Sequence, residues 1–176
     1  MKKTIGIDLD GVLYDFHTAL YNEFVMYHRE SRTFNDFWTS GWKEKPERVK
    51  NNVVLIPTLY EVYDVSYHDK LTLERLAYRY YLVYITSRDK SLEFVTKKWI
   101  ERNKLPYYSD LYFSTDKRIE VSLLGCEYYI EDQVNNVENL LGLTNVILLT
   151  RPWNLHYDNP NVIRINNLQE LDTMEF

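Results

Sequence analysis

The chain has 176 residues, of which 45% are apolar, enough for one domain with a buried core and a modest insertion. Its net charge of −5 lacks the basic excess of proteins that coat long nucleic acids, although a local positive cluster could still bind a small phosphate. A single cysteine, Cys126, excludes an intrachain disulfide and a cysteine metal cluster. No apolar run reaches the ~18 residues of a membrane span, so we expect a cytosolic protein without a membrane partner.

Aromatic residues make up 15% of the chain, with 16 tyrosines. Three interpretations stay open at this point: stacking on flat bases, an oligomer interface such as that of a homodimer, or a core biased toward aromatic side chains.

The first predicted element is a short apolar strand, Thr4–Leu9. Strand alternation sends Asp8 and Asp10 to the same side. Two carboxylates at a strand end repel each other unless a cation lies between them or one holds a proton, and Gly11 permits a sharp turn. The pattern favours a nucleophile and a general acid/base around a hard cation such as Mg²⁺ over a solvated acidic turn.

The interval from Phe16 to His68 breaks the alternation of strands and helices. It has helical patterns at Thr18–Tyr27 and Lys45–Lys50 and a Trp- and Phe-rich segment, Phe34–Trp42. We interpret it as a mainly helical insertion that covers the site, because long structureless loops are uncommon in domains. The alternative is two ordinary crossover helices with long loops.

The next strong strand, Tyr81–Thr86, ends on Thr86-Ser87-Arg88 just before a helical pattern, Leu92–Asn103. A hydroxyl and free amide groups between a strand and a helix can bind phosphate. Threonine and serine are also ordinary helix caps, and the two roles are compatible.

Two further candidates follow. Lys117 begins a helical pattern, Lys117–Leu124, and could bind phosphate or be an ordinary surface lysine. The strand Glu127–Ile130 leads into Glu131-Asp132, where Asp132 could be a further metal ligand or an N-cap acid favoured by the helix dipole.

The rest of the chain continues the alternation, with a helix at Val134–Leu141, a strand at Val146–Leu149 and weaker strands at Asp110–Phe113 and Val162–Ile165. This order predicts a three-layer, Rossmann-like α/β fold with a parallel central sheet, whose reactive groups gather at the carboxyl ends of the strands. We expect a core of residues 1–15 and 69–176 and a helical cap of residues 16–68.

The chemical motifs occur in the order Asp8-Leu9-Asp10, Thr86-Ser87, Lys117 and Glu131-Asp132. This order resembles the four motifs of the haloacid dehalogenase superfamily of phosphatases. More narrowly, Asp8–Phe16, Thr150–Asn154 and Arg164–Asn167 are similar to segments of the 5′(3′)-deoxyribonucleotidases, including phage and bacterial members, which carry a helical cap after the first motif.

The resemblance implies a Mg²⁺-dependent phosphatase that acts on nucleoside monophosphates. Asp8 would form an aspartyl-phosphate, and Asp10 would protonate the leaving oxygen and then deprotonate water. Asp8, the Asp10 backbone carbonyl and Asp132 would hold the metal. Alternatives are a phosphatase of another small ester or of a polynucleotide end, and an inactive phosphate-binding module.

By the same resemblance, Thr86, the Ser87 amide and Lys117 would hold the phosphate. Lys97 and Lys98 are rivals for the lysine position. The family more often has Asp-Asp where this chain has Glu131-Asp132, and often proline where it has Arg88, which bears on the substrate.

Three aromatic residues of the expected cap, Phe16, Trp38 and Trp42, are candidates for stacking on a base, with cap core as the alternative. The histidines show no ligand spacing, so we expect all four to be structural or surface residues: His17, His28, His68 and His156.

Overall fold

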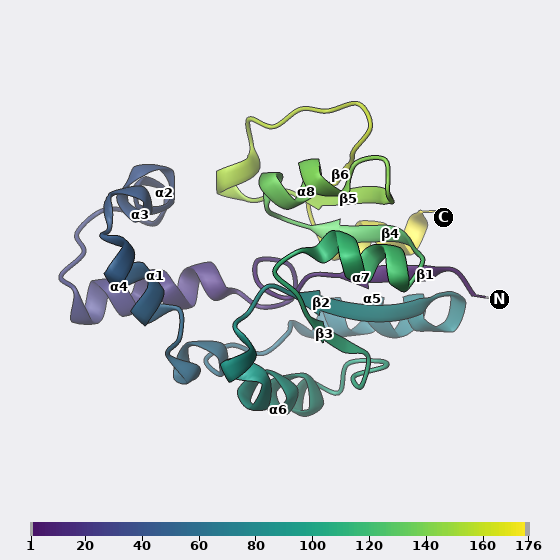
Figure 1. Ribbon diagram of the computed structural model, residues 1–176, viewed down its shortest axis with the longest axis horizontal. Coiled ribbons are helices and arrows are strands. Elements are labelled where there is room, and N and C mark those ends of the chain that lie inside the picture. The colour runs from purple at the N-terminus through teal and green to yellow at the C-terminus, as the bar shows by residue number, and fades with distance from the viewer. Residues whose placement is uncertain (1, 175–176) are drawn as a thin grey trace.

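The computed structural model describes residues 2–174, which form a single parallel sheet flanked by helices (Figure 1). Its strands are β1 (Thr4–Ile7), β2 (Tyr81–Thr86), β3 (Leu111–Phe113), β4 (Cys126–Glu131), β5 (Asn145–Leu149) and β6 (Ile163–Ile165). They lie in the order β3-β2-β1-β4-β5-β6, and every pairing is parallel. The predicted α/β fold is confirmed.

The central position of β1 decides where the chemical groups meet. Ile7, its last residue, pairs with Tyr84 of β2 on one side and with Ile130 of β4 on the other. The Asp8 amide then donates to the Ile130 carbonyl at 3.0 Å, so Asp8 is held beside the end of β4. The carboxyl ends of these strands therefore bring their following residues to one edge of the sheet.

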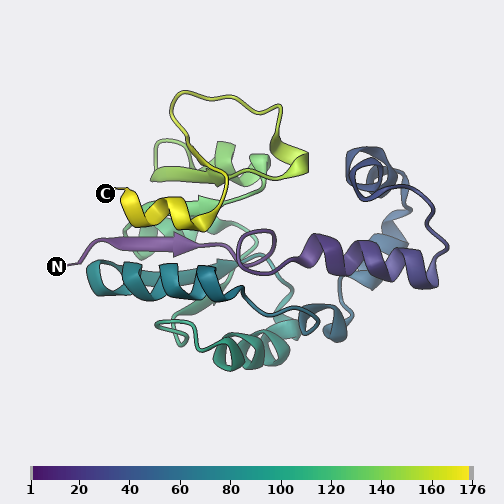
Figure 2. The same ribbon diagram turned by 180° about the vertical axis from the view of Figure 1, so that it is seen from behind.

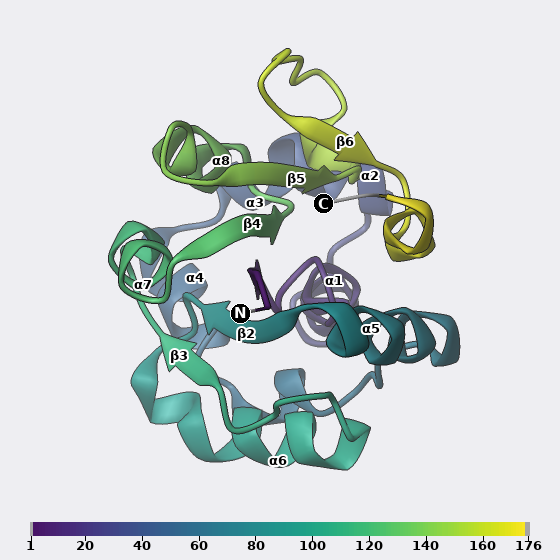
Figure 3. The same ribbon diagram turned by 90° about the vertical axis from the view of Figure 1, so that its right-hand side faces the viewer.

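Helices cover both faces of the sheet, as Figure 3 shows. Helices α7 (Lys117–Leu123) and α8 (Val134–Leu140) pack on one face, and α5 (Tyr67–Arg79) packs with the 3₁₀ helix η5 (Leu168–Thr173) on the other. Alternate residues of β2 enter the two resulting core clusters, so this strand is buried on both sides. Helix α6 (Glu93–Asn103) contributes to the same cluster as α5.

A group of helices lies beyond the carboxyl end of β1, away from the sheet (Figures 1 and 2). It begins with α1 (Phe16–Tyr27), capped by the Asp15 carboxylate, which accepts from the Thr18 amide at 3.2 Å. The remaining segments are α2 (Phe34–Asp36), the π-helix η1 (Phe37–Gly41), α3 (Trp42–Glu44), α4 (Glu47–Val53) and the 3₁₀ helix η2 (Pro57–Tyr60). In residues 2–174 we find no helix with the length and apolar character needed to cross a membrane.

The structure differs from the predicted elements in several places. Strand β1 ends at Ile7 and not at Leu9, because the Leu9 carbonyl accepts from amides of the following turn, at 2.9 Å from Leu13 and 2.8 Å from Tyr14. Helix α4 begins two residues late, since Pro46 occupies its N-cap. Helix α5 was not predicted, and the expected boundary of the cap at residue 68 falls in its first turn.

Candidate active site

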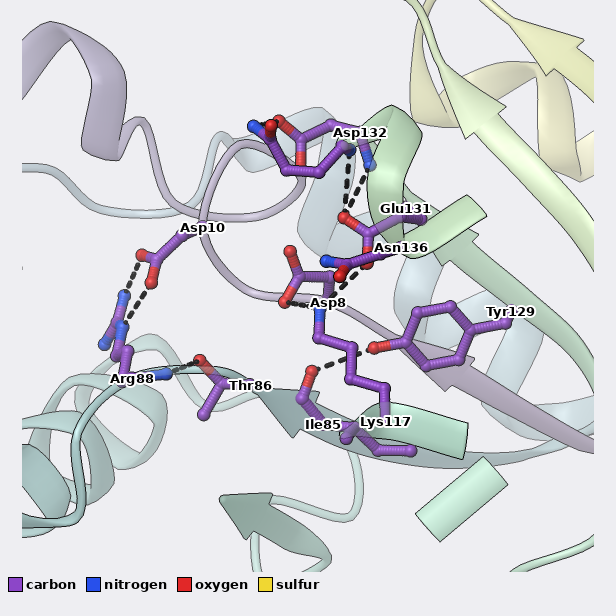
Figure 4. Close-up of polar contacts among 11 residues, drawn as sticks. Asp8, Asp10, Ile85, Thr86, Arg88, Lys117, Tyr129, Glu131, Asp132 and Asn136 are labelled. Atoms are coloured by element: carbon purple, nitrogen blue, oxygen red, sulfur yellow. Dashed lines mark hydrogen bonds and ion pairs between the residues drawn. The ribbon is translucent and has the colours of Figure 1, made fainter. Parts of the chain in front are cut away.

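The centre of the site is Lys117, whose ammonium group is buried between two carboxylates. Its Nζ lies 2.7 Å from Asp8 Oδ1 and 2.8 Å from Glu131 Oε2, and only 4% of the lysine side chain is exposed (Figure 4). Lys117 is the first residue of α7, which Asp116 caps by accepting from the Arg118 amide. The two negative partners hold the pKa of Lys117 well above its usual value despite burial, so the lysine is charged.

Glu131 is held by hydrogen bonds at both of its carboxylate oxygens. Oε1 accepts from the amides of Asp132 and Gln133, each at 3.0 Å. Oε2 accepts from Lys117 Nζ and, at 3.1 Å, from the side-chain Nδ2 of Asn136. Burial alone would raise the pKa of Glu131, but the lysine and the backbone donors outweigh it and leave the pKa below its usual value.

Asp132 is fully buried beside this pair and is only partly hydrogen-bonded. Its Oδ2 accepts from the Trp153 indole at 2.9 Å and from the Gln133 side chain at 3.0 Å. Its buried Oδ1 has no hydrogen-bond partner among residues 2–174. Burial, followed by the charge of Glu131, raises the pKa of Asp132 well above its usual value.

The acidic cluster of Asp8, Glu131 and Asp132 has the composition of a site for a hard cation. One ligand oxygen from each residue lies within 4.8 Å of the others. Burial, then the charge of Glu131, raises the pKa of Asp8 to about 8, although Lys117 opposes the shift. One lysine is thus too little positive charge for three buried carboxylates, and the orphaned Asp132 oxygen fits a cation with oxygen ligands such as Mg²⁺.

Asp10 lies on the other side of Asp8, where Arg88 holds it (Figure 4). Arg88 Nε donates to Asp10 Oδ2 at 2.9 Å, and Nη2 donates to Oδ1 at 2.6 Å. In the sequence, Arg88 stands out only as a departure from the family, and nothing there predicts this contact. No local signal points to it, since the two residues are 78 positions apart.

The predicted phosphate-binding turn reaches the site. Thr86 is buried, and its hydroxyl accepts from the Arg88 amide at 3.2 Å, which fixes the turn after β2. Ser87 is exposed and lines a cavity of about 320 Å³ together with Asp8 and Lys117.

The two rival lysines lie elsewhere on α6. Lys97 is exposed and pairs with Glu93 at 2.5 Å, and Lys98 lies over the ring of Phe94. Neither lines the cavity that contains Asp8, so the geometry favours Lys117 as the lysine of the site.

A second cavity, of about 620 Å³, adjoins the first and has aromatic walls. Phe16, His17 and Gln133 line both cavities, so they mark the junction. Trp38 and Trp42 line only the larger one. All three predicted aromatics therefore line the larger cavity, although each also packs against the main hydrophobic core.

His17 is at the junction, where the sequence gave no reason to place it. Its ring stacks on Trp153 at a centroid distance of 3.6 Å and meets Trp38 edge-on at 4.5 Å. Its Nε2 lies 3.3 Å from Gln133 Nε2, where a neutral ring can accept a hydrogen bond. Burial, then the charge of Arg151, lowers the pKa of His17 to about 3, so the ring is neutral near pH 7.

Known proteins share this architecture. A haloacid dehalogenase-like hydrolase of Streptococcus pneumoniae superimposes with a TM-score of 0.67 at 16% identity, covering 97% of this chain and 96% of that one. The likeness defines the fold class: a haloacid dehalogenase-type, three-layer α/β fold with acidic groups at the sheet edge.

The family follows from sequence. The model of the family described as 5′ nucleotidase, deoxy (pyrimidine), cytosolic type C, matches residues 2–175, and the chain belongs to this family. A Clostridium acetobutylicum nucleotidase is 26% identical over 182 residues, covering 95% of this chain and 90% of that protein. A Halalkalibacterium halodurans protein with a provisional nucleotidase name is also 26% identical, over 187 residues, with 96% and 90% covered. The protein is a hydrolase, a nucleotidase or phosphatase.

The buried neutral state of His17 predicts a pH dependence of stability. Its folded pKa of about 3 lies below the usual value of 6.5, so between these values the unfolded chain binds a proton that the folded chain does not. The contribution of His17 to the free energy of unfolding is fully present above pH 6.5. It decreases as the pH falls toward 3. At pH 5 the loss is about 2 kcal/mol relative to pH 8.

Urea unfolding of wild type and His17→Phe at pH 5 and pH 8 measures this effect. Phenylalanine keeps a flat ring against Trp153 but cannot titrate, so the stability difference between the two proteins should shift in favour of the variant at pH 5. A difference that does not change with pH contradicts the prediction.

Proposed function

We propose that the protein hydrolyses nucleoside monophosphates, most readily deoxynucleotides, through a covalent aspartyl-phosphate on Asp8. One observation carries the proposal: Asp8 and Asp10 line a small cavity with Lys117, and a larger cavity with aromatic walls adjoins it and shares Phe16, His17 and Gln133. A phosphate and a nucleoside need these two environments, one charged and one flat and apolar.

In the proposed reaction, an Asp8 oxygen attacks phosphorus while Asp10 gives a proton to the departing nucleoside oxygen. Asp10, now ionised, takes a proton from the water that attacks the aspartyl-phosphate. This releases inorganic phosphate and restores both carboxyl groups to their starting states. Lys117 and the Ser87 amide offset the charge of the phosphate, with the Thr86 hydroxyl at the same turn.

We propose Mg²⁺ as the cofactor, held by Asp8, Asp132 and the backbone carbonyl of Asp10. The unpartnered Asp132 Oδ1 supports this choice, whereas the oxygens of Glu131 already accept four hydrogen bonds. A bound Mg²⁺ would supply positive charge that lets a carboxylate approach an anionic phosphate.

The proposed nucleoside site is the larger cavity, under a cap of residues 16–68. Phe16, Trp38 and Trp42 would stack on the base, which needs only a flat face. We also propose a cytosolic location, since Cys126 is free and buried and a chain with one cysteine needs no oxidising compartment. The homodimer stays a prediction from the aromatic content.

The roles of the two opening aspartates predict distinct losses. Asp8→Asn should abolish turnover of a deoxynucleoside monophosphate and any trapped aspartyl-phosphate, because an amide is neither nucleophile nor anionic ligand. Asp10→Asn should lower kcat ~10²–10⁴-fold, the usual contribution of general acid–base catalysis. Wild-type kcat in Asp8→Asn, measured by phosphate release, would refute the covalent mechanism.

Activity should require Mg²⁺, and Asp132→Ala should raise the Mg²⁺ concentration for half-maximal activity more than it raises KM, because the change removes a metal ligand and leaves the cavities intact. The measurement is a Mg²⁺ titration of wild type and Asp132→Ala. If Asp132→Ala leaves the Mg²⁺ dependence unchanged, Asp132 is not the metal ligand and Glu131 becomes the first candidate.

Trp153→Phe should have a milder effect, because it removes one hydrogen bond to Asp132 and leaves the carboxylate in place. It should lower the affinity for Mg²⁺ ~10–100-fold.

The cap aromatics should matter for nucleotides and not for small esters. Phe16→Ala, Trp38→Ala and Trp42→Ala should each lower kcat/KM for a nucleoside monophosphate by ~1–3 kcal/mol, roughly 5- to 150-fold, and mostly spare p-nitrophenyl phosphate, which has no base. Thermal unfolding is the control, because truncating a core aromatic costs ~3–5 kcal/mol and harms both substrates. Equal losses with a lowered Tm would assign that residue to the core.

A further inference from the structure

The contact between Arg88 and Asp10 joins a buried cation to a carboxyl group at the wall of the smaller cavity. The guanidinium meets both Asp10 oxygens in a two-pronged arrangement, which fixes the plane of the carboxylate as well as its position. The Arg88 side chain is 1% exposed, whereas that of Asp10 is 22% exposed and lies at the cavity wall. Asp10 itself follows the end of β1 in a turn, directly before Gly11, whose φ is +88°.

Arg88 is anchored independently of Asp10. Its remaining terminal nitrogen, Nη1, donates to the Thr96 hydroxyl of α6 at 3.1 Å. The guanidinium lies over the rings of Tyr60, Tyr14 and Trp99, at 4.4, 5.2 and 5.7 Å from their centroids. The place of Arg88 is therefore also set by contacts with α6, with Tyr60 of η2 and with Tyr14, and not by Asp10 alone.

The energetics make a purely structural role a poor explanation. Burying an arginine is costly unless its partners compensate for the lost hydration. Replacement of a buried ion pair by well-packed apolar side chains is often neutral or stabilising in proteins. The arrangement makes sense if the buried charge serves Asp10, the residue that must meet the leaving oxygen.

We propose that Arg88 is a positioning residue that holds the Asp10 carboxyl group in line with the leaving oxygen of the substrate. This rests on the proposed function, in which Asp10 is the general acid and base. Arg88 itself gives up no proton, since a guanidinium stays charged in proteins. The proton moves from Asp10 to the nucleoside oxygen and returns to Asp10 from water, and Arg88 only fixes the starting geometry.

Leaving-group dependence distinguishes positioning from structure. A nucleoside oxygen leaves as a poor, strongly basic group and needs the Asp10 proton, whereas p-nitrophenolate leaves without protonation. Arg88→Met should therefore lower kcat for a deoxynucleoside monophosphate about 10- to 100-fold, part of the general-acid contribution. With p-nitrophenyl phosphate under single-turnover conditions, phosphoryl transfer should change less than about threefold. Arg88→Lys keeps the positive charge but cannot donate two parallel hydrogen bonds to the carboxyl group, so its kcat for the nucleotide should stay close to that of Arg88→Met.

The decisive experiment is a double-mutant cycle of Arg88→Met and Asp10→Asn on the nucleotide. If Arg88 acts through Asp10, adding Arg88→Met to Asp10→Asn should cost less than about threefold more, so the two losses are strongly non-additive. Additive losses in the cycle, or equal losses on the two esters, would each overturn the proposal. A higher kcat in Arg88→Met would also overturn it, because the contact between Arg88 and Asp10 would then inhibit the reaction. Failure of wild type to hydrolyse any nucleotide would instead refute the proposed function.

Two further variants keep the test valid if Arg88→Met does not fold, which urea unfolding will reveal. Thr96→Val removes the Nη1 anchor with little change in shape and leaves Asp10 untouched. Thr96→Val should lower the rate for the nucleotide more than the rate for p-nitrophenyl phosphate, by a smaller factor than Arg88→Met does. An unchanged ratio of these two rates would count against the proposal. Arg102→Met is the matched control, because it breaks a half-exposed pair with Asp64 and should leave both rates unchanged.

Discussion

Burial of three carboxylates around one lysine is the constraint on which the site depends. Asp8, Glu131 and Asp132 are all nearly inaccessible, and charges in such surroundings are stable only when opposite charges and hydrogen bonds compensate for lost hydration. Lys117 compensates for two of them. The sheet meets this requirement by placing β1 next to β4 and by starting α7 at the lysine, so that one ammonium group reaches both strand ends.

The charges form two systems that meet at Asp8 and Asp10. One runs from Lys117 through the acidic cluster and is short of positive charge, as the raised pKa of Asp8 shows. The other is the pair of Arg88 and Asp10, in which one guanidinium faces one carboxyl group. In the proposed reaction, a phosphate between them would face Asp8, the attacking group, on one side and Asp10 on the other, and an in-line displacement requires the attacking and leaving oxygens on opposite sides of phosphorus.

Asp10 and the walls of the larger cavity are close in sequence. Only five residues separate Asp10 from Phe16, the first residue of α1, and His17 lies beside it at the junction of the two cavities. Its neutral ring joins α1 to Trp153, which in turn donates to Asp132. The wall of the larger cavity is thus connected to the acidic cluster through two contacts, His17 with Trp153 and Trp153 with Asp132.

The sequence by itself determined the parallel α/β sheet, because short apolar strands alternate with helical segments. It also predicted that Asp8, Asp10 and Asp132 would lie close together, because polar groups at strand ends converge in such a sheet. It did not reveal that Arg88 holds Asp10, that His17 lies at the cavity junction, or that α5 belongs to the layers of the core. These features rest on contacts between residues far apart in the chain, such as the 78 positions between Asp10 and Arg88. Local pattern reports which face of an element is buried, but only the packed tertiary structure decides which distant side chain lies against it.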